Sequence, residues 1–154
     1  MKKQIRVYAD TSVFGGVFDS EFMEPSKKFF QQIQNGQFTL CISDVVKREV
    51  ENAPEMVKQF YHELSKLAEM LSINKECIEL REKYVQMGIV SRKSLNDALH
   101  VASASVSGCD IIVSWNFKHI VHYKKISLYN AINRINGYKE IFINSPSEVI
   151  DYGD

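Results

Sequence analysis

The chain has 154 residues, of which 45% are hydrophobic and 25% are charged, as in an ordinary globular protein. Its formal net charge is zero, so no overall positive field indicates a nucleic-acid or membrane partner. A nucleic acid can still bind a groove that is basic only locally. The three cysteines (Cys41, Cys77 and Cys109) are widely spaced and form no C-x-x-C pair, which argues against a disulfide framework and a cysteine zinc site.

The start of the sequence does not have the pattern of a targeting segment. Lys2 and Lys3 are not followed by the apolar region of a signal peptide, and no apolar run approaches the length of a membrane span. No repeat, low-complexity tract or linker divides the chain. We therefore expect residues 1–154 to form one domain in the reducing cytoplasm, with no membrane association.

Short segments rich in apolar and β-branched residues are predicted strands, and helical periodicity fills the intervals between them. In chain order the predicted strands are Ile5–Ala9, Phe38–Ile42, Asp110–Ser114 and Glu140–Ile143. The predicted helices run from about Pro25 to Gln34, Asp44 to Asn52, Pro54 to Leu71, Lys75 to Met87, Ser94 to Ser107 and Ser127 to Ile135. This alternation predicts an α/β fold with a mostly parallel sheet and helices on both faces. Ligands of such sheets bind outside the carboxyl ends of the strands.

The first predicted strand ends in polar residues at the place where a ligand site is expected. Asp10, Thr11 and Ser12 follow Ala9 directly, and a carboxylate there can deliver a metal ligand, with the two hydroxyls supporting it or capping the next turn. The pair Gly15-Gly16 that comes next is interpreted as a sharp turn of the backbone.

Three further polar residues stand at positions that would bring them to the same edge. Glu49 falls on the apolar stripe of its helix, where a carboxylate is costly unless compensated, although a boundary glutamate reaching water is an alternative. Asp97 lies in the first turn of its helix, where a capping box with Ser94 would also explain it. Asn116 follows the strand that ends at Ser114, a position where Asn is commonly a turn residue.

Together these residues favour a site for a hard cation. Three carboxylates in one cleft repel one another and do not all ionise without a cation, and Mg²⁺ or Mn²⁺ prefers such oxygen ligands. Basic residues flank the same positions and suit a phosphate-bearing polymer: Lys47, Arg48, Arg92, Lys93 and Lys118.

The stretches YADTSVFGG, ISDVVKREV, SLNDALHVASA and IIVSWNFKHI, in this order and at these separations, resemble the PIN-domain nucleases, especially the bacterial VapC-type toxins. The resemblance covers nearly the whole chain, down to the closing INSPSEVI. It implies a PIN-like α/β/α sandwich that cleaves RNA with Mg²⁺ or Mn²⁺. Carried over by position, Asp10, Glu49 and Asp97 match the three principal acids, and Ser12 matches the small polar residue that helps order the site.

Asn116 departs from the many family members that have aspartate at the corresponding position. An amide oxygen can still ligate a hard cation or its water but brings no charge, so a second ion would be held less well. The resemblance thus implies a catalytic set of Asp10, Glu49, Asp97 and Asn116. It also implies control by a protein antitoxin, and we expect a homodimer.

Two other functions stay open at this point. A PIN-like domain that binds RNA or protein without cutting is the non-enzymatic alternative, and Asn116 favours it. A haloacid-dehalogenase-like phosphatase is the enzymatic alternative, although the second aspartate two residues after Asp10 is missing. His119 and His122 are interpreted as structural or solvent-facing, and His100 as either supporting the site or lying on the surface.

Overall fold

The computed structural model describes residues 4–151. Its strands, in chain order, are β1 (Ile5–Ala9), β2 (Phe38–Ser43), β3 (Glu69–Leu71), β4 (Ile111–Val113) and β5 (Phe142–Asn144). Its α-helices are α1 (Thr11–Gly16), α2 (Met23–Gln34), α3 (Asp44–Val50), α4 (Glu55–Ser65), α5 (Lys75–Gln86), α6 (Leu95–Val106), α7 (Tyr123–Ile135) and α8 (Pro146–Val149). A 3₁₀ turn, η1 (Arg92–Ser94), leads into α6.

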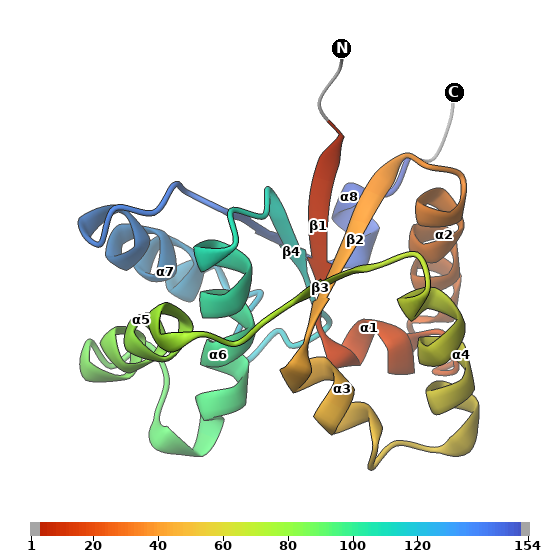
Figure 1. The fold of residues 1–154 in the computed structure, drawn as a ribbon, viewed down its shortest axis with the longest axis horizontal. Coiled ribbons are helices and arrows are strands. Elements are labelled where there is room, and N and C mark those ends of the chain that lie inside the picture. Colours follow the sequence, from red (N-terminus) through yellow and green to blue (C-terminus); the bar gives the residue numbers. More distant parts are fainter. Residues whose placement is uncertain (1–3, 152–154) are drawn as a thin grey trace.

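The five strands form one sheet in the order β3-β2-β1-β4-β5, and each pair of neighbours is parallel. In Figure 1 strands β1, β2 and β4 run downward, with α5, α6 and α7 on the left of the sheet and α2 and α4 on the right. The α/β/α layering and the parallel sheet are confirmed. Helices α1 and α3 begin directly at the ends of β1 and β2, so residues at those ends lie beneath the sheet in this view.

The central position of β1 follows from its sequence. Val7, Tyr8 and Ala9 are fully buried, because helices cover both faces of a strand that has a neighbour on each side. Val7 pairs in register with Leu40 of β2 and Ile111 of β4. The residue that follows Ala9 is therefore delivered to the middle of the carboxyl edge.

The helix predicted from Pro54 to Leu71 is wrong in its last third. Helix α4 ends at Ser65, and Glu69–Leu71 forms the edge strand β3. Leu71 is buried, whereas Glu69 and Met70 are exposed. The apolar residues Leu67 and Leu71 continue the helical period, which hid the change to an extended backbone.

Two more local predictions are corrected. Helix α7 begins at Tyr123 and not near Ser127, because the ring nitrogen Nδ1 of His122 accepts the backbone N–H of Lys124 at 3.2 Å and caps the helix. The glycines Gly15 and Gly16 lie inside α1 with helical backbone and make no sharp turn. None of the helices within residues 4–151 is long and apolar enough to cross a membrane.

Candidate active site

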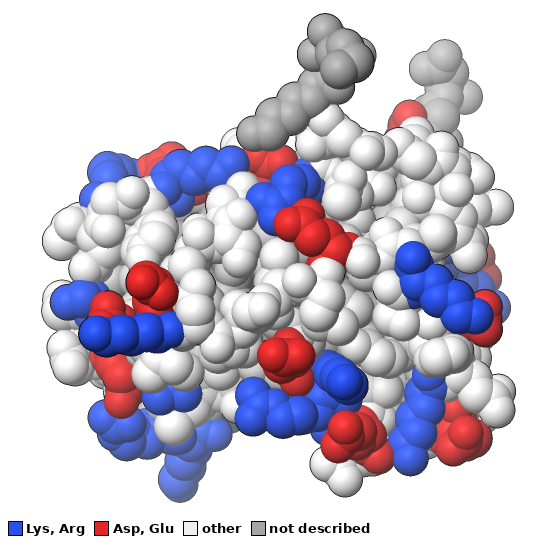
Figure 2. All heavy atoms as spheres, in the orientation of Figure 1, with Lys and Arg blue, Asp and Glu red and all other residues white. Residues whose placement is uncertain are grey.

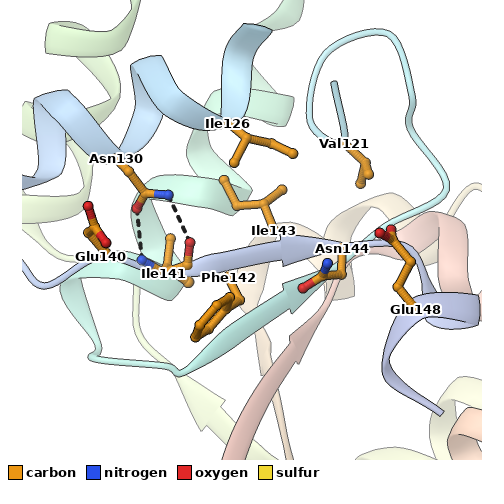
Figure 3. A pocket seen from close by; sticks show the side chains of 9 residues that line it. All are labelled: Val121, Ile126, Asn130, Glu140, Ile141, Phe142, Ile143, Asn144 and Glu148. Carbon is orange, nitrogen blue, oxygen red and sulfur yellow. Dashed lines mark hydrogen bonds between the residues drawn. The ribbon is translucent and has the colours of Figure 1, made fainter. Parts of the chain in front are cut away.

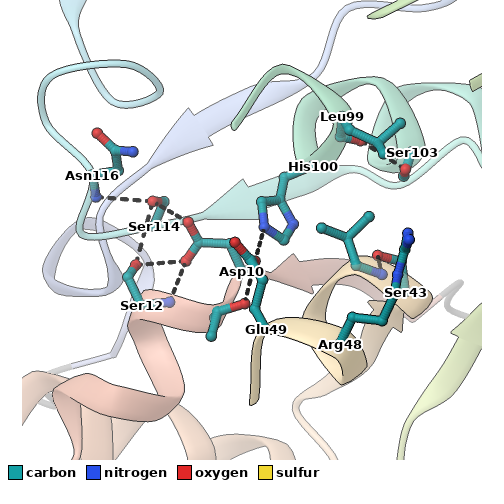
Figure 4. A network of polar contacts seen from close by, with 12 residues as sticks. Asp10, Ser12, Ser43, Arg48, Glu49, Leu99, His100, Ser103, Ser114 and Asn116 are labelled. Carbon is teal, nitrogen blue, oxygen red and sulfur yellow. Dashed lines mark hydrogen bonds and ion pairs between the residues drawn. The ribbon is translucent and has the colours of Figure 1, made fainter. Parts of the chain in front are cut away.

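Asp10 lies buried at the carboxyl end of β1 and caps the first turn of α1. Its Oδ1 accepts the Ser12 hydroxyl at 2.6 Å and the Ser12 backbone N–H at 3.1 Å, and its Oδ2 accepts the Ser114 hydroxyl at 2.6 Å (Figure 4). Burial raises the pKa of Asp10, while the charge of His100 and these hydrogen bonds oppose the rise and the charge of Glu49 adds to it. The carboxylate is thus held in one orientation.

Glu49 comes from α3 and points toward the same place (Figure 4). Its Oε1 accepts the Thr11 hydroxyl at 2.7 Å and lies 2.7 Å from Nε2 of His100. Burial opposes ionisation of Glu49, but the hydrogen bonds from His100 and Thr11 and the charge of His100 outweigh it, so its pKa is lowered. Glu49 is therefore a compensated carboxylate, and its place on the apolar stripe is explained by these partners.

A buried chain of hydrogen bonds fixes His100 behind Glu49. Nδ1 of His100 lies 2.7 Å from the Tyr8 hydroxyl, which lies 2.7 Å from the Ser43 hydroxyl. Ser43 in turn accepts the backbone N–H of Val45 at 3.2 Å. An ionised Glu49 only accepts, so Nε2–H of His100 donates to it. The hydroxyls of Tyr8 and Ser43 continue the hydrogen bonds from Nδ1 into the interior.

The substitution Tyr8→Phe should break this chain at its centre. Nδ1 of His100 and the hydroxyl of Ser43 would lose their partner in a fully buried place, so we expect the free energy of unfolding to fall by about 1–3 kcal/mol. Urea denaturation measures this change. Tyr123→Phe is the matched control, because Tyr123 is 76% exposed and its loss of a hydroxyl should change stability by less than about 0.5 kcal/mol. Equal losses of unfolding free energy in the two variants would show that these buried hydrogen bonds do not stabilise the protein.

Asp97 stands in the first turn of α6, half-buried and close to Asn116. Ser94 makes no side-chain capping bond there, so the capping box that would have given Asp97 a structural role does not form. Burial raises the pKa of Asp97; the charges of His119 and His100 and a hydrogen bond from Asn116 lower it, and the charge of Glu49 raises it.

Asn116 joins the site mainly as a donor. Its Oδ1 accepts the backbone N–H groups of Lys118 at 3.2 Å and His119 at 2.9 Å, the turn role that sequence reasoning also allowed. Because the oxygen is engaged, the amide nitrogen faces Asp97. The backbone N–H of Asn116 donates to the Ser114 hydroxyl at 2.9 Å, which links this turn to Asp10.

The fold thus brings together the acids and hydroxyls singled out in the sequence: Asp10, Thr11, Ser12, Glu49, Asp97 and Asn116. Two members were missed or left open. The sequence predicted Ser114 only as the end of a strand. His100, for which a surface position was left open, is 2% exposed and lies in the interior. The spacing of His100 three residues after Asp97 was the one available signal.

The oxygen ligands of the three acids fit a hard cation, although the acids do not form a complete ligand set. Across residues 4–151, no three His, Cys, Asp or Glu side chains are arranged as a complete ligand set. The carboxylates nevertheless feel one another, because Glu49 raises the pKa of both Asp10 and Asp97. A cation among them would relieve that repulsion.

Basic side chains surround the acids. A shallow pocket is lined by Glu49 and Asp97 together with Arg92 and Lys93. Arg92, Lys93, Lys47 and Arg48 are exposed, and in Figure 2 lysine and arginine gather along the lower side of the molecule, interspersed with carboxylates. The local charge therefore suits an anionic polymer although the chain as a whole is neutral.

A more apolar pocket beside β5 is not part of this site. It is lined by Val121, Ile126 and Phe142, with Glu140 and Glu148 at its rim (Figure 3). Glu140 pairs with Arg134, and Glu148 accepts the backbone N–H of Ser145 at 2.8 Å, so each acid has a structural partner there.

Comparison with known proteins gives a family match and similar solved structures. The model of the PIN domain family matches residues 7–121. The structure is similar to VapBC2 from Rickettsia felis bound to a DNA fragment from its promoter, with a TM-score of 0.56 and 16% identity, covering 91% of this chain and 98% of that one. It is also similar to VapC20 of Mycobacterium tuberculosis, a sarcin-ricin loop cleaving toxin, with a TM-score of 0.57 and 12% identity over 88% of this chain and 98% of that one. No curated protein matches the chain in sequence.

Proposed function

The chain belongs to the PIN domain family, and from this we propose that it is a Mg²⁺- or Mn²⁺-dependent endoribonuclease of the VapC type, the toxin of a type II toxin–antitoxin pair. One observation carries the proposal. Three carboxylates, one directly after β1 and the others from α3 and α6, lie close enough at the carboxyl edge of the sheet for Glu49 to raise the pKa of the other two. Each has a hydrogen-bond partner, and Arg92 and Lys93 line the pocket that holds Glu49 and Asp97. We also propose that residues 1–154 are one domain, because β5 and α8 complete the sheet and core beyond the matched residues.

In this proposal Asp10, Glu49 and Asp97 would hold the ion. The chemistry that a bound ion would supply is an activated water and neutralisation of charge on the phosphodiester. The chain's own residues fix the geometry: Ser12 and Ser114 orient Asp10, Thr11 and His100 orient Glu49, and Asn116 orients Asp97. Asn116, predicted from the sequence as part of the catalytic set, is in this proposal a positioning residue for the ligand Asp97. The exposed Arg92 and Lys93 bind the phosphates of the strand.

Single-stranded or looped RNA is the proposed substrate, because its unpaired nucleotides can enter a cleft that a duplex cannot. The description of VapC20 as a sarcin-ricin loop cleaving toxin supports this choice. The non-cleaving alternative keeps one observation in its favour, since the Asn116 oxygen is already bonded to two backbone N–H groups. The haloacid-dehalogenase-like phosphatase has no support from the family match.

A protein antitoxin and self-association complete the proposal. The similar structure is that of VapBC2 bound to a DNA fragment from its promoter, and this complex supports an antitoxin partner here. The exposed apolar side chains of Met56, Leu67 and Met70, on and after α4, support a homodimer. The cytoplasm is the proposed compartment, because the RNA substrate and the antitoxin would be found there.

Purified protein should cut single-stranded RNA in Mg²⁺ or Mn²⁺, and EDTA should stop the reaction, because in this proposal the metal ion activates the attacking water. Gel analysis of an end-labelled RNA measures the cut. Activity that returns when Mn²⁺ is added back in excess of the EDTA would attribute it to the ion. Strand binding with no cleavage in either metal would favour the non-cleaving alternative, and cleavage that persists in EDTA would contradict the mechanism.

A further inference from the structure

Beside the carboxylates lies a group of aromatic rings that the metal chemistry does not use. We infer that these rings, Phe22, Trp115 and Phe117, which we call the aromatic platform, stack the base of a nucleotide next to the scissile phosphate. The inference rests on the proposed ribonuclease function and adds how the enzyme holds a single strand.

The platform is a fixed structure. The rings of Phe22 and Trp115 stack with centroids 4.3 Å apart and an angle of 19° between their planes. The indole N–H of Trp115 donates to the hydroxyl of Ser26, which is fully buried, at 2.8 Å. The indole also lies against Gly16, where an added Cβ would be 2.7 Å from its nitrogen. The indole is therefore held on one face by a ring and on one edge by a hydrogen bond.

Phe117 is the part of the platform that a ligand can reach. It is 48% exposed, and its ring lies 6.1 Å from Trp115 and 6.5 Å from Phe22, inclined to both. Its contacts with the other two rings hold Phe117 on one side, and its exposed part can receive a ligand.

Hydrogen bonds join the platform to the carboxylates. The backbone N–H of Trp115 donates to the Ser12 hydroxyl at 2.9 Å, and that hydroxyl donates to Asp10 at 2.6 Å. Asn116, between the two rings in sequence, orients Asp97. A base stacked on Phe117 would thus have its own phosphate close to the acids.

The composition of the segment favours a nucleic acid over a protein as the ligand. Residues 115–125 contain three lysines, two histidines and three aromatic residues, with no Asp or Glu. Lys118, next to Phe117, is exposed. Aromatic rings interleaved with cations are the features that bind single strands, and every base offers a face to stack.

The test is the affinity of the whole protein for short RNA strands, measured by fluorescence anisotropy with Ca²⁺ as the hard cation. Phe117→Ala should weaken binding of an intact strand about tenfold or more. It should leave binding of the same strand with abasic sites nearly unchanged, because that strand has no base to lose. Phe142→Ala is the matched control, since Phe142 is 71% exposed on β5, outside the platform, and should bind like the parent.

Trp115 is the only tryptophan, so its fluorescence reports on the platform directly. Intact strands should quench it and abasic strands should not. In cleavage assays with Mn²⁺, Phe117→Ala should raise KM and leave kcat within about threefold of the parent.

The outcomes separate this inference from the proposed function. Strand binding that depends on Phe117 without any cleavage would overturn the nuclease and retain the platform. Cleavage with unchanged affinity in Phe117→Ala, or no binding of RNA by the parent, would overturn the platform. An effect of Phe117→Ala on a protein partner's binding but not on RNA would assign the rings to that partner and would also overturn it.

Discussion

Replacing Asp97 by Asn is expected to lower RNA cleavage by about a hundredfold or more while leaving the metal-free protein at least as stable as the parent. Removal of even a group that orients a metal ligand commonly costs ten- to a hundredfold, and loss of the ligand itself costs no less. Burial and Glu49 both disfavour the charge on Asp97, so a neutral side chain of the same shape relieves a repulsion. A carboxylate that served only to cap α6 would behave in the opposite way and cost about 1 kcal/mol when lost.

Thermal unfolding with and without Mn²⁺ gives a second readout. An ion that binds only the folded state raises the melting temperature, and this rise should shrink strongly in Asp97→Asn. Asp44→Asn is the matched control, because Asp44 also begins a helix but is exposed. It should keep both the activity and the response to Mn²⁺. A variant at position 97 that is active and fully responsive to Mn²⁺ would remove Asp97 from the site.

The dependence of this comparison on pH follows from the raised pKa of Asp97. Above that pKa the parent carries a charge that folding disfavours, so without metal it should be less stable than Asp97→Asn. As the pH falls through the folded pKa, the carboxyl takes up a proton in the folded state first, and the parent gains stability. The difference in free energy of unfolding between the parent and Asp97→Asn should therefore shrink on acidification. It should stop changing below the ordinary pKa of an aspartyl group. Urea denaturation in EDTA from pH 7.5 to about pH 3, which extends below the ordinary aspartyl pKa of about 3.9, measures this difference in stability.

The substitution Gly16→Ala should destabilise the protein by about 1–3 kcal/mol, because it overpacks the place where α1 meets Trp115. A Cβ there would lie 2.6 Å from the Ser26 hydroxyl oxygen and 2.7 Å from the Trp115 indole nitrogen. Both atoms belong to the hydrogen bond that holds the indole, so neither can move without weakening it. Urea denaturation and the emission of Trp115 would report the loss of stability and the displaced ring.

The adjacent Gly15 is the control for this change. Its added Cβ would meet no atom within 4 Å, although it lies in the same helix. Gly15→Ala should therefore stabilise α1 by about 0.5–1 kcal/mol, the usual gain from replacing glycine in a helix. If both variants shifted stability in the same direction, close packing against Trp115 would not be the reason for glycine at position 16.

The parts of the fold that were predictable from sequence are those whose pattern is local. The buried run Val7, Tyr8, Ala9 is apolar on both faces, and Ser43 stands before a helical stripe that its hydroxyl does cap. The proximity of Asp10 and Glu49 was predicted from two arguments. Ligand sites of parallel sheets lie outside the carboxyl ends of the strands, and the sequence motifs resemble those of PIN-domain nucleases.

The parts that were not predictable depend on contacts between distant segments. Glu69–Leu71 is a strand because it pairs with Cys41–Ser43 and because Glu69 bonds Arg6, neither of which leaves a mark in its own sequence. The role of His100 could not be predicted from its own segment, because its hydrogen-bond partners come from β1 and α3. The reason for Gly16 lies in a tryptophan that is far away along the chain.

The order of the strands has a consequence for the time at which the proposed activity begins. β1 is made first, but one of its two neighbours, β4, is made last but one among the described strands, and Asn116 follows β4. At about 5–20 residues per second, a ribosome needs roughly 5–20 s to proceed from Asp10 to Asn116. A chain that is interrupted before β4 lacks the Ser114 that orients Asp10 and the Asn116 that orients Asp97. Nascent and truncated chains should therefore be harmless to the RNA around them, including the messenger from which they are being translated.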